Sequence, residues 1–404
     1  MAQKFEELYD MDLFSNLVVR TKKEFLLKKK NESILCFNLY YTIIGSIECE
    51  IVGVFTYDPK KLPVGLTISG DSLLDWLQTR FIPKHRAYVD KILETLKTNR
   101  DDLASLLSIT LGLSLTDDYW VVPTDKNYRW EDYNLYDNEF SEALASVAFT
   151  GVPRKLDKFA SSPEYTTDGM LPKCWRRING KIYLFKGGTS GFANSGLEPY
   201  SEFYAAQVAE ALGVDHVYYD LTMWKDRLCS VCELFTSKEV SLVPAYMYLG
   251  RNAAEILVRT HTSGRSDLSS SLMDMIVFDW IIANQDRHLG NFGVLRDNST
   301  GQIIKFAPLF DHGMSLLHQA LDSDFNDLED YFSIRKFTFL NLPYDSIDLI
   351  VPLVKNKQKL ALENLLEFQF RKHEKYNLSD YRLEFLSMFV RERAKKLLTA
   401  INKS

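Results

Sequence analysis

The spacing of hydrophobic positions changes several times along the chain, and each change marks a candidate strand or helix. Residues 33–58 are rich in β-branched and aromatic side chains, which favours strands. Residues 86–97 carry apolar side chains at helical spacing, which predicts a helix. Residues 101–113 begin with Asp and have Gly near their end, which indicates a second helix. Residues 117–144 are aromatic and polar, so we expect an ordered loop there.

A second set of elements begins near Gly151. Residues 161–173 are full of turn formers. Residues 180–188 alternate like a strand, and residues 227–235 are typical of a buried strand. The periodicity of the last fifty residues, including 378–401, predicts a helix.

Residues 198–214 form a further predicted helix. Phe203, Val208 and Leu212 can share one face, and Gly213 can cap the end. The helix follows directly after the strand-like residues 180–188, so the two elements are expected to be neighbours.

The most informative pattern is a helix followed by a polar loop and a hairpin. Residues 270–285 have helical periodicity, and residues 292–297 and 302–310 are strands joined by the turn Asn-Ser-Thr-Gly. The intervening loop holds an Asp, an Arg, a His and an Asn within six residues.

Composition and charge narrow the class of protein. At 404 residues the chain is long enough for about two domains, and 46% apolar with 25% charged residues is ordinary for a globular protein. The net charge of −6 disfavours direct nucleic-acid binding and anionic membranes. The basic segment 21–32 is interpreted as a solvated helix face or turn.

The sequence also predicts a cytoplasmic protein. It has no apolar run of the roughly eighteen residues that a membrane span needs. Residues 1–14 are acidic and broken by charges, unlike a secretory signal. Five scattered cysteines fit a reducing compartment, and the Cys229–Cys232 pair is interpreted as coincidence within a buried strand rather than as a metal or redox motif.

Three polar residues near the hairpin have the chemistry of phosphoryl transfer. Asp286 and Asn291 belong to the loop, and the chain returns Asp311 to the same end of the hairpin. An Asp can accept a hydroxyl proton, while an Asn and a second Asp are hard oxygen ligands for Mg²⁺. The structural alternative is that Asp286 and Asn291 only cap and turn the chain, with His288 a core histidine.

A Lys and a Glu upstream stand in the order that a kinase requires. Lys186 ends the predicted strand 180–188, and Glu202 lies in the helix that follows. A kinase needs such a Lys on the nucleotide phosphates and a helix Glu that holds it. The alternatives are an ordinary strand-end Lys and a first-turn Glu favoured by the helix dipole.

These motifs together resemble one family. "NQDRHLGNFGVL", "FAPLFDHG", "YLFKGG", "EFYAAQVAEALGV" and "CELF" are similar to the HipA-like kinases over residues 151–404. The resemblance implies that Asp286 is the catalytic base, that Asn291 and Asp311 are metal ligands, and that Lys186 binds the nucleotide phosphates. It also implies that Glu233 and Phe235 offer backbone groups to adenine. We count His288 among the nucleotide-binding candidates.

Residues 166–173 are similar to the phosphate-covering loop of that family. Gly169 and Lys173 are therefore candidate nucleotide-binding residues. Known members carry an autophosphorylated Ser in this loop, and Thr166 falls at its position. The hydroxyls at Ser161, Ser162 and Thr167 are equally available, with turn formation as their ordinary role. The loop departs from the family in having one Gly and in placing Leu171 where Gln is common.

The resemblance implies a bilobal, protein-kinase-like α+β fold. Residues 1–150 would be an N-terminal α/β accessory region, residues 151–236 the N-lobe, and residues 237–404 the C-lobe. The implied activity is that of an ATP- and Mg²⁺-dependent Ser/Thr protein kinase, autophosphorylating in the loop 161–169 and acting as a toxin-like or regulatory kinase on an unidentified protein substrate. The family allows an antitoxin-type DNA-binding partner.

Two alternatives remain. "DRHLGN" is also similar to the catalytic loop of phosphoinositide kinases, which would make the chain a lipid kinase. Residues 318–332, however, are acidic and hold no Lys or Arg, which disfavours an anionic head group. The other alternative is a nucleotide-binding pseudokinase that acts as an interaction module. It would ordinarily have lost Lys186, Asp286, Asn291 or Asp311, and all four are present.

Overall fold

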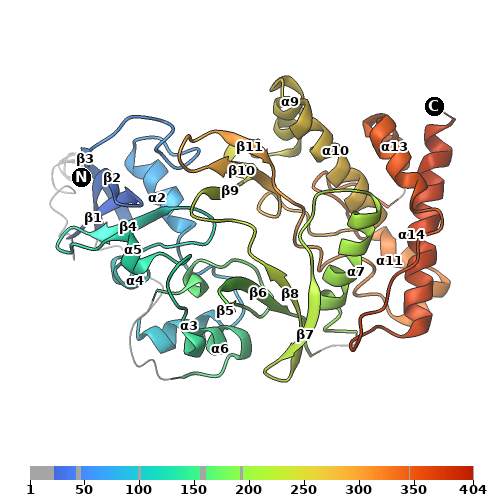
Figure 1. The fold of residues 1–404 in the computed structure, drawn as a ribbon, viewed down its shortest axis with the longest axis horizontal. Helices are drawn as coiled ribbons and strands as arrows, with labels where there is room; N and C mark the ends of the chain where they lie inside the picture. Colours follow the sequence, from blue (N-terminus) through green and yellow to red (C-terminus); the bar gives the residue numbers. More distant parts are fainter. Residues whose placement is uncertain are drawn as a thin grey trace, which may run out of the picture.

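The residues that the structure describes form a mixed α+β fold, and their strands lie in three antiparallel sheets (Figure 1). The structure is a computed structural model that describes residues 22–41, 47–98, 102–154, 161–191, 194–344 and 346–403. The strands are β1 Lys22–Lys29, β2 Glu32–Tyr41, β3 Ile47–Val54, β4 Tyr119–Pro123, β5 Lys173–Ile178, β6 Lys181–Gly187, β7 Asp220–Trp224, β8 Arg227–Glu233, β9 Val240–Pro244, β10 Gly293–Asp297 and β11 Ile303–Phe306.

Helices connect and cover these sheets. They are α2 Gly70–Gln78, α3 Val89–Leu96, α4 Leu103–Thr110, α5 Trp130–Tyr133, α6 Glu142–Thr150, α7 Glu198–Ala211, α8 Ala245–Tyr248, α9 Ala253–Thr262, α10 Ser266–Ile281, α11 Glu329–Ser333, α12 Ile347–Ile350, α13 Asn356–Glu363 and α14 Asp380–Ile401. Short 3₁₀ turns lie at Pro163–Tyr165, Asp322–Asn326 and Val351–Leu353. No helix in these described ranges is both long enough and apolar enough to cross a membrane.

The first sheet has the strand order β3-β2-β1-β4. Strands β2 and β3 confirm the prediction for residues 33–58. The interpretation of residues 21–32 as a solvated helix face or turn is wrong, because residues 22–29 form β1, between β2 and β4. Phe25 and Leu27 of β1 are fully buried, and strand alternation places them on one face of the sheet.

Residues 117–144 are more regular than expected. The prediction of an ordered loop is wrong for Tyr119–Pro123, which form the fully buried strand β4, and for the short helix α5. The physical reason is pairing: β4 lies beside β1 and is covered by Trp130, whose ring meets that of Trp120 at 5.7 Å. The predicted helices 86–97 and 101–113 are confirmed as α3 and α4.

The second sheet, in the order β5-β6-β8-β7, carries part of the candidate site. Helix α6 packs against β5, and α7 packs against β6, β7 and β8. Strands β6 and β8 and helix α7 confirm the predictions for residues 180–188, 227–235 and 198–214. In α7, Val208 and Leu212 are buried and Phe203 is half-buried, while Gly213 follows the helix with φ +63°.

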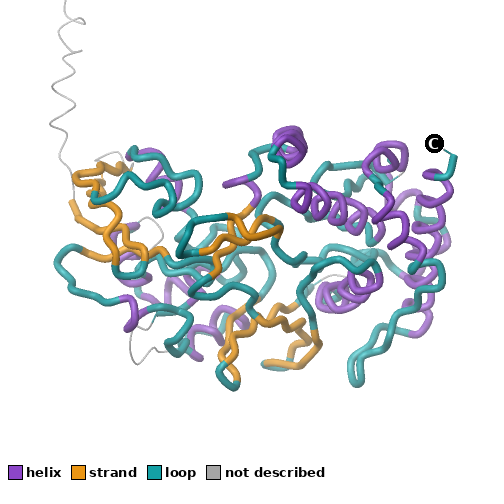
Figure 2. The backbone as a smooth tube through the Cα atoms, turned by 45° about the horizontal axis from the view of Figure 1, so that its top comes forward, coloured by secondary structure: helices purple, strands orange, loops and turns teal. Residues whose placement is uncertain are grey.

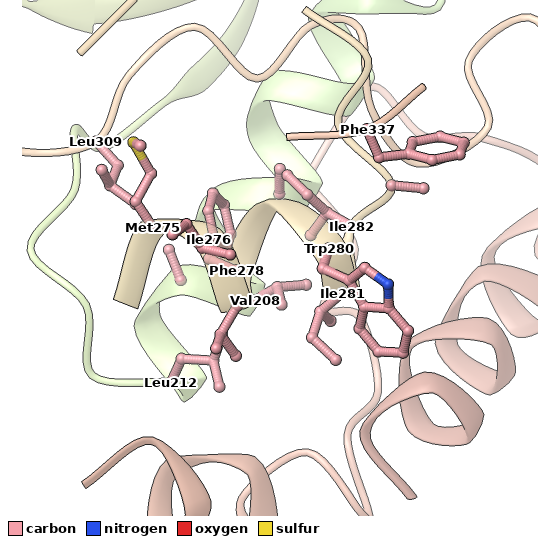
Figure 3. Close-up of a cluster of buried hydrophobic side chains, with 14 of the residues drawn as sticks. Val208, Leu212, Met275, Ile276, Phe278, Trp280, Ile281, Ile282, Leu309 and Phe337 are labelled. Atoms are coloured by element: carbon pink, nitrogen blue, oxygen red, sulfur yellow. The ribbon is translucent and has the colours of Figure 1, made fainter. Parts of the chain in front are cut away.

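The third sheet has the order β11-β10-β9 and lies beside the long helix α10. The helix, the hairpin β10–β11 and the loop between them match the predicted arrangement. Figure 3 shows Met275, Ile276 and Phe278 of α10 close to Val208 and Leu212 of α7. Full burial of one such side chain stabilises the fold by about 1.5–3 kcal/mol. Because α10 ends at Ile281, its packing against α7 also positions the loop that follows it.

The first sheet and the C-terminal helices lie at opposite ends of the molecule. Figures 1 and 2 show α11, α13 and α14 gathered at one end, away from β1–β4. Helix α14 confirms the predicted C-terminal helix, and its Arg393 guanidinium lies 3.8 Å from the ring centroid of Trp280 in α10. The division at residue 150 stays a prediction. The prediction that residues 1–14 are not a secretory signal also stays one, because they lie outside the described residues.

The first and third sheets are joined by a buried arginine. Arg296 of β10 donates hydrogen bonds to the carbonyl of Leu62 (3.2 Å) and to the hydroxyl of Tyr119 (2.9 Å). It is 3% exposed. Residues before position 150 therefore contact the third sheet directly through polar groups as well as through packing.

Candidate active site

The candidate site is centred on Lys186, at the end of β6. Its side chain is buried, and its Nζ lies 2.7 Å from Oε1 of Glu202 in α7. The same ammonium group also donates to Oδ1 of Asp311. The structure thus brings together three predicted residues from a strand, a helix and the segment after β11.

Glu202 connects this ion pair to the backbone beyond β11. Its Oε1 accepts from Lys186, and its Oε2 accepts from the amide of His312 at 2.7 Å. The carboxylate is 1% exposed, so these charge-assisted bonds replace the water that it has lost. Glu202 of α7 therefore supports Asp311 in two ways, through Lys186 and through the backbone amide of His312.

Asp311 itself has an uncommon backbone conformation. Its φ is +59°, in the left-handed region that few residues other than Gly adopt, although Asp does so more often than most. Its amide donates to the hydroxyl of Tyr219 at 3.0 Å. The side chain is 28% exposed, which leaves the carboxylate accessible beside Lys186.

The loop after α10 brings Asp286 and Asn291 together. The side-chain amide of Asn291 donates to the carbonyl of Asp286 at 3.0 Å, and the backbone amide of Asn291 donates to His288 at 2.9 Å. The amide oxygen of Asn291 is the end not used in the bond to Asp286. His288 is exposed, so the alternative of a core histidine is wrong, and its Nδ1 accepts from the amide of Gly290 at 3.1 Å.

Two residues that the sequence reasoning did not single out hold this loop in place. Arg287 is fully buried and pairs with both carboxylate oxygens of Asp279, each at 2.9 Å. It also donates to the carbonyls of Asn291 (2.8 Å) and Phe310 (2.5 Å). A buried charge needs a partner, so Asp279 within the otherwise apolar stretch 275–282 was the available signal.

Arg287 also joins the loop to the residue after Asp311. One guanidinium nitrogen lies 3.0 Å from Nδ1 of His312. Burial and the charge of Arg287 hold the pKa of His312 well below its ordinary value, so the ring is neutral and accepts that hydrogen bond. The group Asp279–Arg287–His312 thereby holds the Asp286–Asn291 loop against Asp311.

Electrostatics separate the two aspartates of the site. Burial raises the pKa of Asp286, against the opposing charge of His288. Burial acts in the same direction on Asp311, but the charges of Lys186 and Lys173 outweigh it and hold its pKa below the ordinary value. Two carboxylates with pKa values moved in opposite directions suit different roles, a base and a charged ligand.

Lys186 stays charged in these surroundings. Burial opposes the charged form, but the carboxylates of Asp311 and Glu202 outweigh it and raise the pKa of Lys186. The ammonium group is therefore a permanent cation at the centre of the site. It is suited to an anionic ligand such as phosphate.

The predicted phosphate-covering loop lies next to Lys186. Its last residue, Lys173, begins β5 and is paired in register with Lys186. The Nζ of Lys173 donates to the carbonyl of Asp168 at 2.6 Å. Gly169 has φ +105°, a conformation that strains any other residue, and an added Cβ would displace the flexible tip of Lys173.

The candidate phosphorylation hydroxyls differ in their surroundings. Thr166 donates to the carbonyl of Leu113 at 2.9 Å, and Thr167 donates to the carbonyl of Pro163 at 2.6 Å. Ser162 is buried and caps the 3₁₀ turn at Pro163–Tyr165. Ser161 is half-buried. Modification of Thr166 or Thr167 requires these hydrogen bonds to open.

The predicted adenine-binding segment follows β8. Glu233 is the last residue of β8, and its side chain pairs with Lys181 at the surface at 2.8 Å. The Phe235 ring lies 5.5 Å from that of Phe310, the residue before Asp311. This segment links the second sheet to β9 of the third. Cys229 and Cys232 of β8 are free thiols.

The donor set suits magnesium better than a transition metal. Over the ranges that the structure describes, no group of three or more His, Cys, Asp or Glu side chains is placed to hold a metal ion by itself. Mg²⁺ is ordinarily bound through one or two carboxylates together with substrate phosphates and water. Asp311 and Asn291 fit that pattern in combination with a nucleotide.

Comparison with known proteins gives one curated relative. No family model matches the sequence. The Ser/Thr-protein kinase CtkA of Helicobacter pylori is 28% identical over 138 residues, which are 30% of this chain and 42% of that protein. The chain thus matches less than half the length of this relative.

Solved structures give a similarity that extends over most of the chain. A chain from the Shewanella oneidensis toxin–antitoxin complex of HipA, HipB and operator DNA covers 94% of this chain and 99% of its own length, with a TM-score of 0.50 and 13% identity. The H. pylori proinflammatory kinase CtkA covers 57% and 94%, with a TM-score of 0.44 and 19% identity. The first of these shows a shared fold. Together with the sequence relative, it supports the resemblance of this chain to the HipA-like kinase family.

Proposed function

We propose that this chain is an ATP- and Mg²⁺-dependent Ser/Thr protein kinase of HipA type. The observation that carries the proposal is the position of Lys186 between Glu202 and Asp311, with Arg287 holding the Asp286–Asn291 loop against the same segment. Phosphoryl transfer needs this combination of a phosphate-binding Lys, a Glu that orients it, two oxygen ligands for Mg²⁺ and a base.

Each residue has a role that its surroundings support. Lys186 and Lys173 bind the nucleotide phosphates, and the loop around Gly169 covers them. Asn291 and Asp311 hold Mg²⁺, which supplies positive charge to the phosphate oxygens when bound. The backbone at Glu233 and Phe235 contacts adenine. His288 is an exposed polar side chain at the edge of the nucleotide site.

Asp286 takes the proton of the acceptor hydroxyl. Burial raises the pKa of Asp286, which strengthens its carboxylate as a base. Lys186 and Glu202 contribute no proton, and they only fix the position of the phosphates. The proposal includes the bilobal arrangement, with residues 151–236 carrying Lys186 and residues 237–404 carrying Asp286.

The acceptor is proposed to be a Ser or Thr hydroxyl of a neutral or basic protein. Tyr331 accepts a hydrogen bond from Gln285, directly before Asp286, at 3.1 Å. The preceding residues include the exposed acidic side chains of Asp327, Glu329 and Asp330. This negative charge disfavours a phosphoinositide head group, so the protein kinase is preferred to the lipid kinase.

The remaining proposals follow from the family. Autophosphorylation in the loop 161–169, with Thr166 as the first candidate, is one of them. A toxin-like or regulatory role in the cytoplasm and an antitoxin-type DNA-binding partner are others. The Shewanella oneidensis structure contains HipA with HipB and operator DNA.

The test is transfer of labelled phosphate from γ-labelled ATP in the presence of Mg²⁺. The full chain is incubated alone and with a basic protein acceptor, and label is mapped by mass spectrometry. Asp286→Asn is expected to lower the transfer rate by about 10²–10⁴-fold, because it removes the base. Asp267→Asn, at an exposed ion pair with Arg265, is the matched control and is expected to transfer normally.

Label in the wild-type chain that is lost only in Asp286→Asn supports the proposal. A wild-type chain that binds ATP but transfers no label to itself or to the acceptor would support the pseudokinase instead. Equal labelling of the wild-type and Asp286→Asn chains would contradict the assignment of the base.

A further inference from the structure

Arg86 is a buried arginine from the region before residue 150, and it donates hydrogen bonds to the loop that covers the candidate phosphate site. It is 3% exposed and lies just before α3. It donates to the carbonyl and the carboxylate of Glu164. It also donates to the carbonyls of Thr167 (3.0 Å) and Lys173 (3.2 Å). One guanidinium thus contacts the loop at Glu164, at Thr167 and at Lys173, where β5 begins.

Glu164 connects Arg86 to β5. Its carboxylate is 1% exposed, and its Oε1 accepts from the amide of Trp175 at 2.7 Å. Arg86 and Glu164 together therefore connect the start of the loop to the strand that pairs with β6. A charge-assisted, multiply bonded arginine fixes geometry more closely than a single point contact.

Two further contacts from the N-terminal region reach the same loop. His85 Nε2 lies 2.9 Å from Oδ1 of Asp168, although both side chains are largely exposed. The carbonyl of Leu113 accepts from Thr166. The loop is thus contacted at positions 164, 166, 167, 168 and 173 from residues that precede it by more than fifty positions.

On its other side the loop is attached to the candidate nucleotide site. Lys173 donates to the carbonyl of Asp168 and lies in register with Lys186. The loop is therefore bonded to Arg86 and, through Lys173, lies next to Lys186. A displacement of the Arg86 side chain would break its hydrogen bond to the carbonyl of Lys173.

We propose that Arg86 is a positioning residue that sets the loop 164–169 over the nucleotide phosphates. The region before residue 150 then contributes to nucleotide binding and is more than an accessory region. This inference rests on the proposed function. It adds that ATP affinity depends on a side chain outside the kinase-like region.

The variants are chosen so that the fold survives. Arg86→Lys keeps the charge beside Glu164 but cannot reach four acceptors at once. The double variant Arg86→Met with Glu164→Gln removes both buried charges together, which avoids an unpaired carboxylate, and Gln keeps an acceptor for Trp175. Arg296→Lys is the matched control, because Arg296 is equally buried and joins the same N-terminal region to β10, away from the loop.

Two measurements are made on the full chain. Hydrogen exchange of the backbone amides of residues 164–169 is recorded without nucleotide, and MgATP affinity is measured by calorimetry. For both Arg86 variants we expect faster exchange in the loop and an affinity about tenfold weaker. The value of kcat at saturating ATP should change far less than KM, because the base and the metal ligands are untouched. Arg296→Lys should leave both readings at wild-type values.

The inference is overturned if the Arg86 variants bind MgATP as tightly as the wild-type chain, if loop exchange is unchanged, or if Arg296→Lys has the same effects. Failure of the proposed function gives a different result. The wild-type chain itself then does not bind MgATP, whatever the exchange data show.

Discussion

At the scale of single residues, Lys173 carries a charge that its surroundings disfavour. Burial, followed by the positive charge of Lys186, lowers the pKa of Lys173 from 10.5 to about 8. Between these two values the unfolded chain binds more protons than the folded one. The free energy of unfolding therefore rises with pH across that window, because Lys173 loses a charge that burial disfavours. This gain in stability is lost as the pH falls through about 8. An anion bound beside Lys173 would offset the free-energy cost of burying its charge.

This leads to a prediction about proton uptake. At about pH 8.5 part of the Lys173 population is neutral, and bound phosphate raises the pKa by favouring the charged form. MgATP binding is thus expected to take up protons, measured by calorimetry in two buffers of different ionisation enthalpy. Lys173→Met should take up fewer protons at this pH, whereas at about pH 6.5 the two chains should match. Equal uptake by both chains at about pH 8.5 would place Lys173 away from the phosphates.

The residues that could be predicted from the sequence are those with a recognisable chemical order along the chain. Lys186, Glu202 and Asp311 are far apart in sequence, yet the structure brings them into contact. Arg287 and Arg86 were not predicted as site residues. Their role depends on which carbonyls lie around them after folding, and no spacing in the sequence encodes that.

At the scale of elements, predictions succeeded for the long, buried helices. Helices α7 and α10 were found although residues 204–209 of α7 and 272–281 of α10 are buried without interruption, so neither helix has a single buried face. Strand β1 was missed because its lysines dominate the composition, although Phe25 and Leu27 alternate between them. Strand β4 was missed because its pairing with β1 is non-local. Both errors lie in the first sheet, where tertiary contacts outweigh local preference.

The prediction at this scale concerns Gly169 in the loop 161–173. Gly169→Ala is expected to cost about 1–3 kcal/mol of folding stability, since φ is +105°. It should also displace the flexible tip of Lys173 and weaken MgATP binding, measured by calorimetry beside urea unfolding. Gly264→Ala is the matched control, with φ +71° and no atom within 4 Å of the added Cβ. The role of the loop would be contradicted if both variants bound MgATP equally well.

At the scale of the whole molecule, the candidate site is assembled from elements that lie far apart along the chain. The second sheet supplies Lys186, α7 supplies Glu202, and the α10 loop and the segment after β11 supply the aspartates. Residues before position 150 contact the loop through Arg86 and the hairpin through Arg296. The resemblance covered only residues 151–404, so these contacts were not predicted from the sequence.

The central claim is that Lys186, Glu202 and Asp311 form a site for ATP with Mg²⁺. The most direct measurement is the dissociation constant of ATP, by calorimetry, with and without Mg²⁺. We expect the wild-type chain to bind ATP more tightly with Mg²⁺, and Lys186→Met and Asp311→Asn to bind at least about tenfold more weakly. Lys305→Met, at an exposed ion pair with Asp215, should bind like the wild-type chain. A wild-type chain that does not bind ATP with Mg²⁺, or site variants that bind it equally well, would contradict the account.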